Sequence, residues 1–295
     1  MTFFLFNMLN GLQLSMLIFL MAIGLTVIFG LMDILNLAHG AFYMIGAYFG
    51  YVVFQATGSF WAAFAFAPLL PMFLGFLLQY YVLQPLIDRG RTAHLDMALL
   101  TFGLLFFTIG VIDFIFFETW GLTFMSIDKP AGLDSYVNVG TFYPAYRLFI
   151  IALGLVVAFA VWFILERTVI GAVVRAGVDD REMVRAMGVN IYLIFAGVFA
   201  LGCGLAGLAG VVAGAELSID GHMGVQILIP TLVVVVIGGL GSVKGCFFGA
   251  LIVGMTETFA QAYVPALALF ATYLLLALML VFRPQGFFGQ APKTV

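Results

Sequence analysis

The residues of this chain that could do chemistry are polar side chains set inside long apolar segments. The stretch LMDILNLAHGAFYMIGAY, residues 31–48, carries Asp33, Asn36 and His39, and Glu257 stands in VGMTETFAQAY. An ionisable group at membrane depth is costly and commonly marks a solute or ion path. Glu257 is the deepest of these groups by residue count. As an alternative to a role in such a path, Glu257 would make a structural hydrogen bond to a neighbouring helix. The alternative for Asp33, Asn36 and His39 is a place at the cytoplasmic interface. Further polar residues in apolar segments are Gln13, Thr26, Asp113, Gln226 and Gln261.

Two glycine-rich motifs resemble nucleotide-binding sequences but lack the required context. GCGLAG, residues 202–207, has the spacing of a dinucleotide-binding fingerprint, yet it lies in an apolar helix and no strand precedes it. We therefore interpret it as a helix-packing motif. In GGLGSVKG, residues 238–245, Val243 precedes Lys244 and Gly245 follows it, whereas a phosphate-binding loop has Gly before the lysine and Ser or Thr after it. The sequence thus shows no recognisable ATP-binding motif.

The glycines of the second motif, together with Pro230, predict an interruption in an apolar segment. Asn36 and Gly40 predict a second interruption, at which Asn36 caps the helix that follows. Interrupted segments in matching positions of two repeats are typical of a translocation path. For His39 we expect a capping or packing role rather than direct solute contact. The candidate path residues are Asn36, His39, Gly40, Gly239, Gly241 and Glu257.

The composition places the chain in a membrane. Of 295 residues, 64% are hydrophobic and only 8% are charged, whereas a soluble domain has about 25% charged residues. A spanning helix needs about 20 apolar residues, which predicts an all-α polytopic fold of eight to nine transmembrane helices, some short or broken, in a single domain over residues 1–295. The two cysteines, Cys203 and Cys246, lie in apolar segments and are expected to be packing residues. The predicted spans are 12–35, 41–56, 60–84, 96–117, 147–165, 191–215, 225–242, 246–262 and 266–283.

The distribution of Lys and Arg predicts the orientation, because these residues gather in cytoplasmic loops. Most of the basic residues fall in three regions of the chain. Two predicted spans separate the first region from the second, and four separate the second from the third, so all three regions can face the cytoplasm, with the N-terminus outside. The loop from Glu118 to Arg147 then faces outward and has only two basic residues. The start, MTFFLFNMLNG, has no basic n-region and no small-residue cleavage site, so we expect it to be the mature N-terminus. The basic residues are Arg89, Arg91, Arg167, Arg175, Arg181, Arg185, Arg283 and Lys293.

A weak internal repeat accompanies this topology. AHGAFYMIGAYFG, residues 38–50, is similar to VKGCFFGALIVG, residues 243–254, and pairs His39 with Lys244. Each segment follows a span that runs inward and precedes two further spans and a basic tail, so the two copies would run parallel. The repeat-like blocks are 12–84 and 225–283. The alternative is chance similarity between glycine-rich helices.

The stretch ERTVIGAVVRAGVDDREMVRAMGVN, residues 166–190, is too polar to span a membrane. Asp179 or Asp180 can cap a short helix in it, and Gly188 can end that helix in a left-handed turn. A cytoplasmic helix with apolar and basic groups suits docking to another protein, and the alternative is a helix lying on anionic lipid. One face is expected to carry Met183, Val184 and Met187, with Arg181 and Arg185 one turn apart.

The chain resembles the permease subunits of branched-chain amino-acid ABC importers, specifically the first of the two paired permeases. The resemblance covers nearly the whole chain. It rests on GLTVIFGLMDILNLAHGAFYMIGAY (24–48), the stretch 166–190, GLAGLAGVVAGA (204–215), VVVVIGGLGSVKGCFFGALIVGMTE (233–257) and LVFRPQGFFG (280–289). It implies a permease without its own ATPase, a second permease that is identical or paralogous, two cytoplasmic ATPases and an extracytoplasmic solute-binding protein. ATP and magnesium would bind the partner subunits, no cofactor or metal would bind this chain, and the location would be a bacterial-type inner membrane.

The same resemblance makes 166–190 the coupling segment that enters a cleft on the ATPase. Importer permeases often carry there a Glu, two Ala and, after three more residues, a Gly. Glu182 and Gly188 keep that spacing, but Met183 and Val184 replace the alanines. The expected coupling residues are Arg175, Asp179, Arg181, Glu182, Arg185 and Gly188. The outward segments 118–146 and 216–224 are expected to meet the binding protein, with Asp128, Asp134 and Asp220 as contact candidates.

Several functions stay open from the sequence. An amino acid is the leading substrate, but the same family also serves urea, short amides and aromatic carboxylates. A stand-alone ion-coupled transporter would use Glu257, Asp113 or His39 as its coupling site and would need no coupling segment. An intramembrane enzyme would need a convergent catalytic set, which the sequence does not show.

Overall fold

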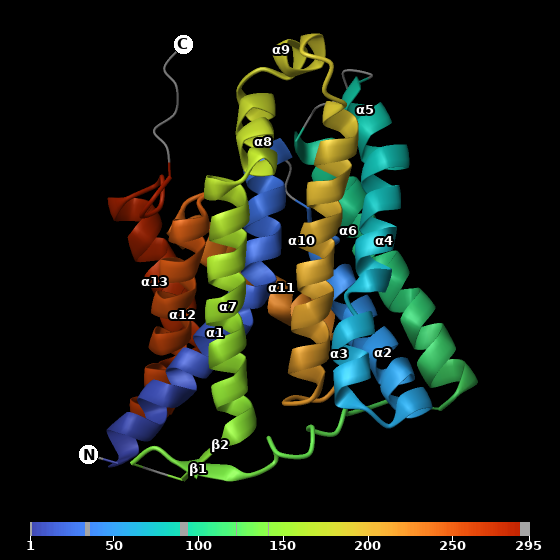
Figure 1. Ribbon diagram of the computed structural model, residues 1–295. Coiled ribbons are helices and arrows are strands. Elements are labelled where there is room, and N and C mark those ends of the chain that lie inside the picture. Colours follow the sequence, from blue (N-terminus) through green and yellow to red (C-terminus); the bar gives the residue numbers. More distant parts are fainter. Residues whose placement is uncertain (1, 33–35, 89–93, 122, 141, 290–295) are drawn as a thin grey trace.

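The protein folds as an elongated helical bundle, seen here in a computed structural model that describes residues 2–32, 36–88, 94–121, 123–140 and 142–289 (Figure 1). Two shorter apolar helices run over Met223–Gly238 and Phe270–Phe282. Together with the longer apolar helices, they confirm an all-α polytopic membrane protein. Within the described residues, the helices long and apolar enough to cross a membrane are Thr2–Gly30, Phe60–Ile87, Leu95–Glu118, Ala145–Arg167, Ile191–Gly214 and Val243–Tyr263.

The helices fall at the nine predicted spans. In the described part of the chain they are α1 (Thr2–Met32), α2 (His39–Thr57), the run α3, α4, η1 and α5 (Phe60–Phe66, Leu69–Leu77, Leu78–Leu83 and Gln84–Asp88), α6 and η2 (His94–Asp113 and Phe114–Thr119), α7 (Ala145–Arg167), α10 (Ile191–Gly214), α11 (Met223–Gly238), α12 (Val243–Tyr263), and η3 and α13 (Pro265–Leu267 and Ala268–Phe282). Three connections also contain structure: β1 (Tyr136–Asn138) pairs antiparallel with β2 (Phe142–Pro144), and α8 (Val169–Asp179) and α9 (Arg181–Ala186) lie between α7 and α10.

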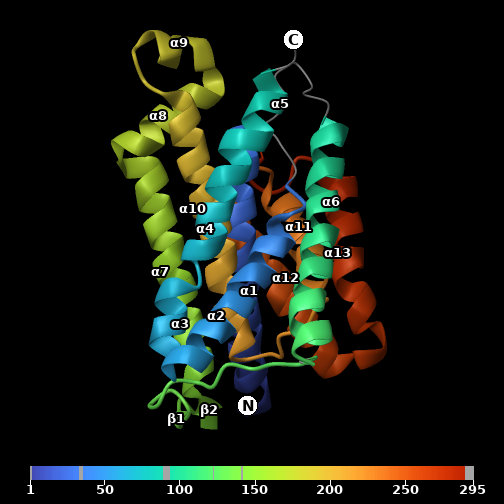
Figure 2. The same ribbon diagram turned by 90° about the vertical axis from the view of Figure 1, so that its right-hand side faces the viewer.

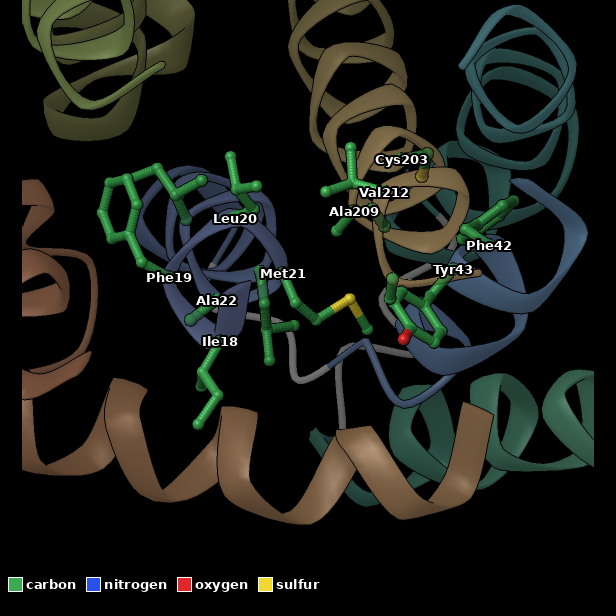
Figure 3. Packing of buried hydrophobic residues seen from close by; sticks show 14 of the residues in the cluster. Ile18, Phe19, Leu20, Met21, Ala22, Phe42, Tyr43, Cys203, Ala209 and Val212 are labelled. Carbon is green, nitrogen blue, oxygen red and sulfur yellow. The ribbon is translucent and has the colours of Figure 1, made fainter. Parts of the chain in front are cut away.

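Helix α1 is the centre of the bundle. It packs against α12, α10, α7 and α11, and its residues from Met16 to Ile23 are almost completely buried. Figure 3 shows Met21 of α1 and Tyr43 of α2 directed toward one another beside α10. The helix begins at Thr2 rather than near residue 12, because Phe3 and Phe4 pack on aromatic rings of α12 at centroid distances of 5.9 and 5.6 Å.

Close helix crossings depend on small residues. A Cβ at Gly24 of α1 would overlap the carbonyl of Gly202 in α10, and a Cβ at Gly46 of α2 would overlap the backbone of Gly207. The GCGLAG motif therefore lies within α10 and lets it approach α1 and α2, as the packing interpretation predicted. Without a hydrophobic drive between helices in lipid, such close van der Waals contact is what holds them together.

The two ends of the bundle carry different structures. Helix α13 ends, and α8 and α9 project, at one end, while α1 begins and the hairpin of β1 and β2 lies at the other (Figure 1). This arrangement brings the basic stretch 166–190 and the end of α13 to the same side, as the orientation prediction requires; Arg89, Arg91 and Lys293 lie outside the described residues. Helices α2 and α12 both run toward the hairpin end, as a parallel repeat would need. Which end faces the cytoplasm stays a prediction.

Two details of the predicted interruptions are wrong. Helix α2 begins after Ala38, which makes no side-chain cap bond, and the buried Asn36 side chain makes no hydrogen bond to any described residue, so Asn36 is not the cap. Helix α11 continues through Pro230 and ends at Gly238. A proline inside a membrane helix is tolerated where neighbouring groups satisfy the freed carbonyl, so only the glycines that follow break this segment.

Candidate functional site

The coupling stretch folds as two short helices with the caps expected from the sequence. The Asp180 Oδ1 atom accepts from the Met183 amide at 2.9 Å and so begins α9, and Gly188 follows it with φ +82°. That φ lies in the left-handed region that glycine adopts without strain. Helix α8 is fixed to the bundle through Val174, which is buried, and through Gly177, which touches Ile191 and Phe195 of α10.

The apolar face predicted for this stretch is split. Val184 is 2% exposed and packs into the core cluster, whereas Met183 and Met187 are 62% and 67% exposed. The prediction that all three share one face is wrong, because Val184 lies on the side of α9 that faces the bundle. The two methionines form an exposed pair at the tip of the projection.

The arginines of the stretch contact their own chain. The Arg185 guanidinium lies 4.1 Å from the centroid of the Tyr192 ring, and that of Arg181 lies 5.1 Å from the Phe195 ring. Arg175 donates to the carbonyl of Leu165 at the end of α7. Cation–π contacts of this kind are worth about 0.5–1 kcal/mol at exposed sites. Three of the six predicted coupling residues thus brace α8 and α9, while Asp179, Glu182 and Gly188 are exposed on the projection.

The first interruption lies inside the bundle. His39 is completely buried, and its Nε2 atom lies 3.0 Å from the Met21 carbonyl oxygen of α1, beside the crossing of Gly24 and Gly202. A Cβ at Gly40 would overlap the carbonyl of Gly224 at the start of α11. His39 and Gly40 therefore join α2 to its neighbours by packing. Asp33 lies outside the described residues.

The second interruption is closed by the C-terminal segment. Gly239 and Gly241 have φ of +98° and +79°, and Gly241 packs on Gly30 of α1. The amides of Phe287 and Phe288 donate to the carbonyls of Ile237 and Gly238 at 2.9 and 3.0 Å. These are among the carbonyls that the end of a helix leaves without an intrahelical donor. These bonds join the segments 233–257 and 280–289, on both of which the resemblance rests. The sequence alone does not show that these two segments are in contact.

Glu257 lines a groove between α11, α12 and α13. The Gln261 Nε2 atom donates to the Glu257 Oε1 atom at 3.3 Å, and Gln226 lines the groove from α11. Three of the polar residues that stood isolated in apolar segments of the sequence therefore meet in one place. Helices α11 and α13 lie on one side of the bundle, together with α6 (Figure 2).

The structure brings the two predicted contact segments for a binding protein together at the hairpin end. Met125 and Ile219 form an isolated antiparallel bridge, and the Ile127 amide donates to the carbonyl of Gly214 at 3.2 Å. Asp128 and Asp134 are exposed on the first segment. Asp220 is half-buried, and its Oδ1 atom accepts from the backbone amide of His222 at 2.8 Å, so it shapes its own turn.

A charged network that the sequence analysis missed fixes this hairpin end. Glu216, whose side chain is 6% exposed, pairs with Arg147 at 2.6 Å and with Lys129 at 3.0 Å. Arg147 and Tyr143 both donate to Asn10 Oδ1 of α1, at 2.9 and 3.1 Å. Burial raises the pKa of Tyr143 to about 12, and the neighbouring Arg147 opposes that rise. The signal available in the sequence was that Lys129 and Arg147 are the only basic residues of this loop.

Known proteins similar to this chain are transport permeases. The family described as "Branched-chain amino acid transport system / permease component" matches residues 7–283. The BraD permease protein of a high-affinity branched-chain amino acid transport system in Pseudomonas aeruginosa is 27% identical over 96% of this chain and 95% of its own length. The LivH permease protein of Escherichia coli is 26% identical over 98% and 96%, and the LivM permease protein of the same organism is 27% identical over 92% and 68%.

Among solved structures, PsaBC from Streptococcus pneumoniae in complex with Fab is similar at a TM-score of 0.47 and 14% identity, over 92% of this chain and 89% of that one.

The family match covers most of the helical bundle, the projection of α8 and α9 and the segment up to the end of α13. Relatives of the LivH and LivM kinds both match, which fits a member of a permease pair. The chain therefore belongs to the family of branched-chain amino acid transport system permease components.

Proposed function

We propose that this chain is the translocation subunit of an ATP-binding-cassette importer for branched-chain or other hydrophobic amino acids. The observation that carries the proposal is the near full-length similarity to permeases named for branched-chain amino acid transport. The proposed assembly contains a second permease, two cytoplasmic ATPases that hold ATP and magnesium, and an external binding protein. This chain contributes the path and needs no cofactor of its own, with its N-terminus outside and its C-terminal end in the cytoplasm.

In the proposed cycle, ATP binding closes the ATPase dimer and moves the projection of α8 and α9. The arginine contacts to Phe195 and Tyr192 support this coupling, because they tie α9 to α10, whose glycines pack directly on α1 and α2. A displacement at α9 would therefore reach the centre of the bundle through packed helices. The path would open toward a loaded binding protein because the two states differ in the contacts they make with the partners.

The test is uptake into proteoliposomes that contain the whole complex, purified through a tag on this chain. ATP is enclosed, the binding protein is added outside, and labelled leucine, urea and benzoate are compared in parallel. We expect accumulation of leucine that requires both ATP and the binding protein and that persists when ionophores collapse proton and sodium gradients. Accumulation of urea or benzoate instead would change the substrate class. Uptake that ignores ATP and follows an ion gradient would contradict the importer.

A further inference from the structure

The groove beside Glu257 has the size and the lining of a small-solute site. Its volume is about 290 Å³, close to the lower limit of about 300 Å³ for ligand pockets in proteins. It lies between three helices, so its polar groups come from elements that the bundle holds in place. The polar residues and the proline that line it are Gln226, Pro230, Glu257, Gln261, Thr272 and Tyr273.

The lining combines one negative charge with neutral donors and acceptors. Among the described residues, Glu257 is the only carboxylic acid that lines the groove, and no Lys, Arg or His lines it. The Gln261 bond engages one carboxylate oxygen of Glu257. Pro230 has no N–H to give to the carbonyl of Gln226, so that carbonyl lacks its usual donor within α11. A solute with an ammonium group fits these acceptors, and the amide and hydroxyl donors suit its carboxylate.

The position of the groove along the bundle also fits a solute station. Glu257 stands about 9 Å from the end of α12 at Tyr263, at 1.5 Å per residue, and is therefore nearer that end than its residue count in the sequence suggested. This end of α12 is the hairpin end, where the two candidate binding-protein segments meet. A carboxylate at this depth needs protein or water rather than lipid on its open side.

We propose that this groove is the entry station of the path, where Glu257 binds the ammonium group of an amino acid released by the binding protein. The proposal rests on the proposed function and adds the group that recognises the solute. It also explains why a carboxylate stands within a helix that is long and apolar enough to cross a membrane. An anionic solute without an ammonium group, such as benzoate, would find no positive side chain in this lining.

The first experiment compares Glu257→Gln, Glu257→Asp and the control Asp96→Asn in the reconstituted complex. Asp96 is exposed on α6 and lies outside the groove. We expect Glu257→Gln to lower leucine uptake on the order of tenfold, the loss expected for a charge-assisted hydrogen bond, while Glu257→Asp retains part of the activity. Complex assembly and the stimulation of ATPase activity by the binding protein should stay at wild-type levels in all three variants.

Two results of this experiment would overturn the proposal. Unchanged leucine uptake in Glu257→Gln would show that the carboxylate binds no solute, and a parallel loss of assembly would give Glu257 a structural role. In both cases the wild-type complex would still accumulate leucine with ATP, so the proposed function would stand. A wild-type complex that accumulates no leucine would instead refute the function itself.

A second measurement detects the attraction for cations without depending on transport. Gln261→Cys, made in the whole complex, is treated with a trimethylammonium and with a sulfonate methanethiosulfonate reagent. The native cysteines of this chain, Cys203 and Cys246, are buried. When each rate is divided by the rate of the same reagent with a free thiol in solution, we expect the cationic reagent to be favoured about tenfold over the anionic one, and adding Glu257→Gln should remove this preference. Equal normalised rates in the presence of the native Glu257 would contradict an ammonium-binding groove.

Discussion

At the scale of single residues, the side chains of this protein act in two ways: some shape their own backbone, and others depend on partners from distant helices. Asp180 and Gly188 begin and end α9 as predicted, because capping and left-handed turns are local. Asn36 was wrongly expected to cap α2. The partners of Glu216 and Glu257 come from other helices, and no local pattern in one sequence identifies them.

Gly210 allows a test, at the scale of one residue, of the packing between α2 and α10. A Cβ there would overlap the Tyr43 carbonyl of α2, and because this contact is backbone, α2 or α10 would have to shift. We expect Gly210→Ala to destabilise the fold by about 1–3 kcal/mol, the usual cost of overpacking. The matched control is Gly197→Ala on the same helix, where a Cβ meets nothing within 4 Å, and which should keep or raise stability. Thermal unfolding midpoints of both variants in one detergent would decide, and equal midpoints would contradict the crossing of α2 and α10.

At the scale of elements, helix positions were predictable because lipid leaves the backbone few options. A chain in a bilayer has to satisfy its backbone groups within helices, so apolar length alone located the helices at the nine predicted spans in the described part of the chain. The direction of a helix face was not predictable in the same way. Val184 turns inward and the adjacent Met183 outward because α9 rests on α10, and that contact exists only in the folded chain.

The exposed methionine pair gives the element-scale prediction. If α9 enters an apolar cleft of an ATPase, Met183→Glu with Met187→Glu should place two charges in that interface and reduce co-purification of the ATPases at least about tenfold. Both side chains are exposed, so the variant should unfold at the wild-type temperature. Phe124→Glu, which changes an exposed apolar residue at the opposite end of the bundle, is the matched control and should leave ATPase binding intact. Normal ATPase recovery with the double variant would exclude α9 tip contacts from the interface.

At the scale of the whole molecule, the two ends of the bundle carry separate tasks in the proposed importer. One end has the projection of α8 and α9, and the other has the joined segments around Met125 and Ile219. Helix α1 connects them: it packs on α10, to which α9 is tied, and its Asn10 accepts bonds from the network of Arg147 and Tyr143. Partners at the two ends could thus influence each other through one central helix.

This arrangement predicts the orientation, which single-cysteine labelling measures directly. Asp134→Cys and Met187→Cys place thiols on exposed residues at the hairpin end and at the tip of α9. The native Cys203 and Cys246 are buried and give little background. In intact cells a membrane-impermeant maleimide should label Asp134→Cys but not Met187→Cys, which should react only after the membrane is opened, because basic segments stay on the cytoplasmic side. The reverse pattern would put α9 outside, where no ATPase could reach it, and would remove the coupling role of α8 and α9 along with the entry position of the Glu257 groove.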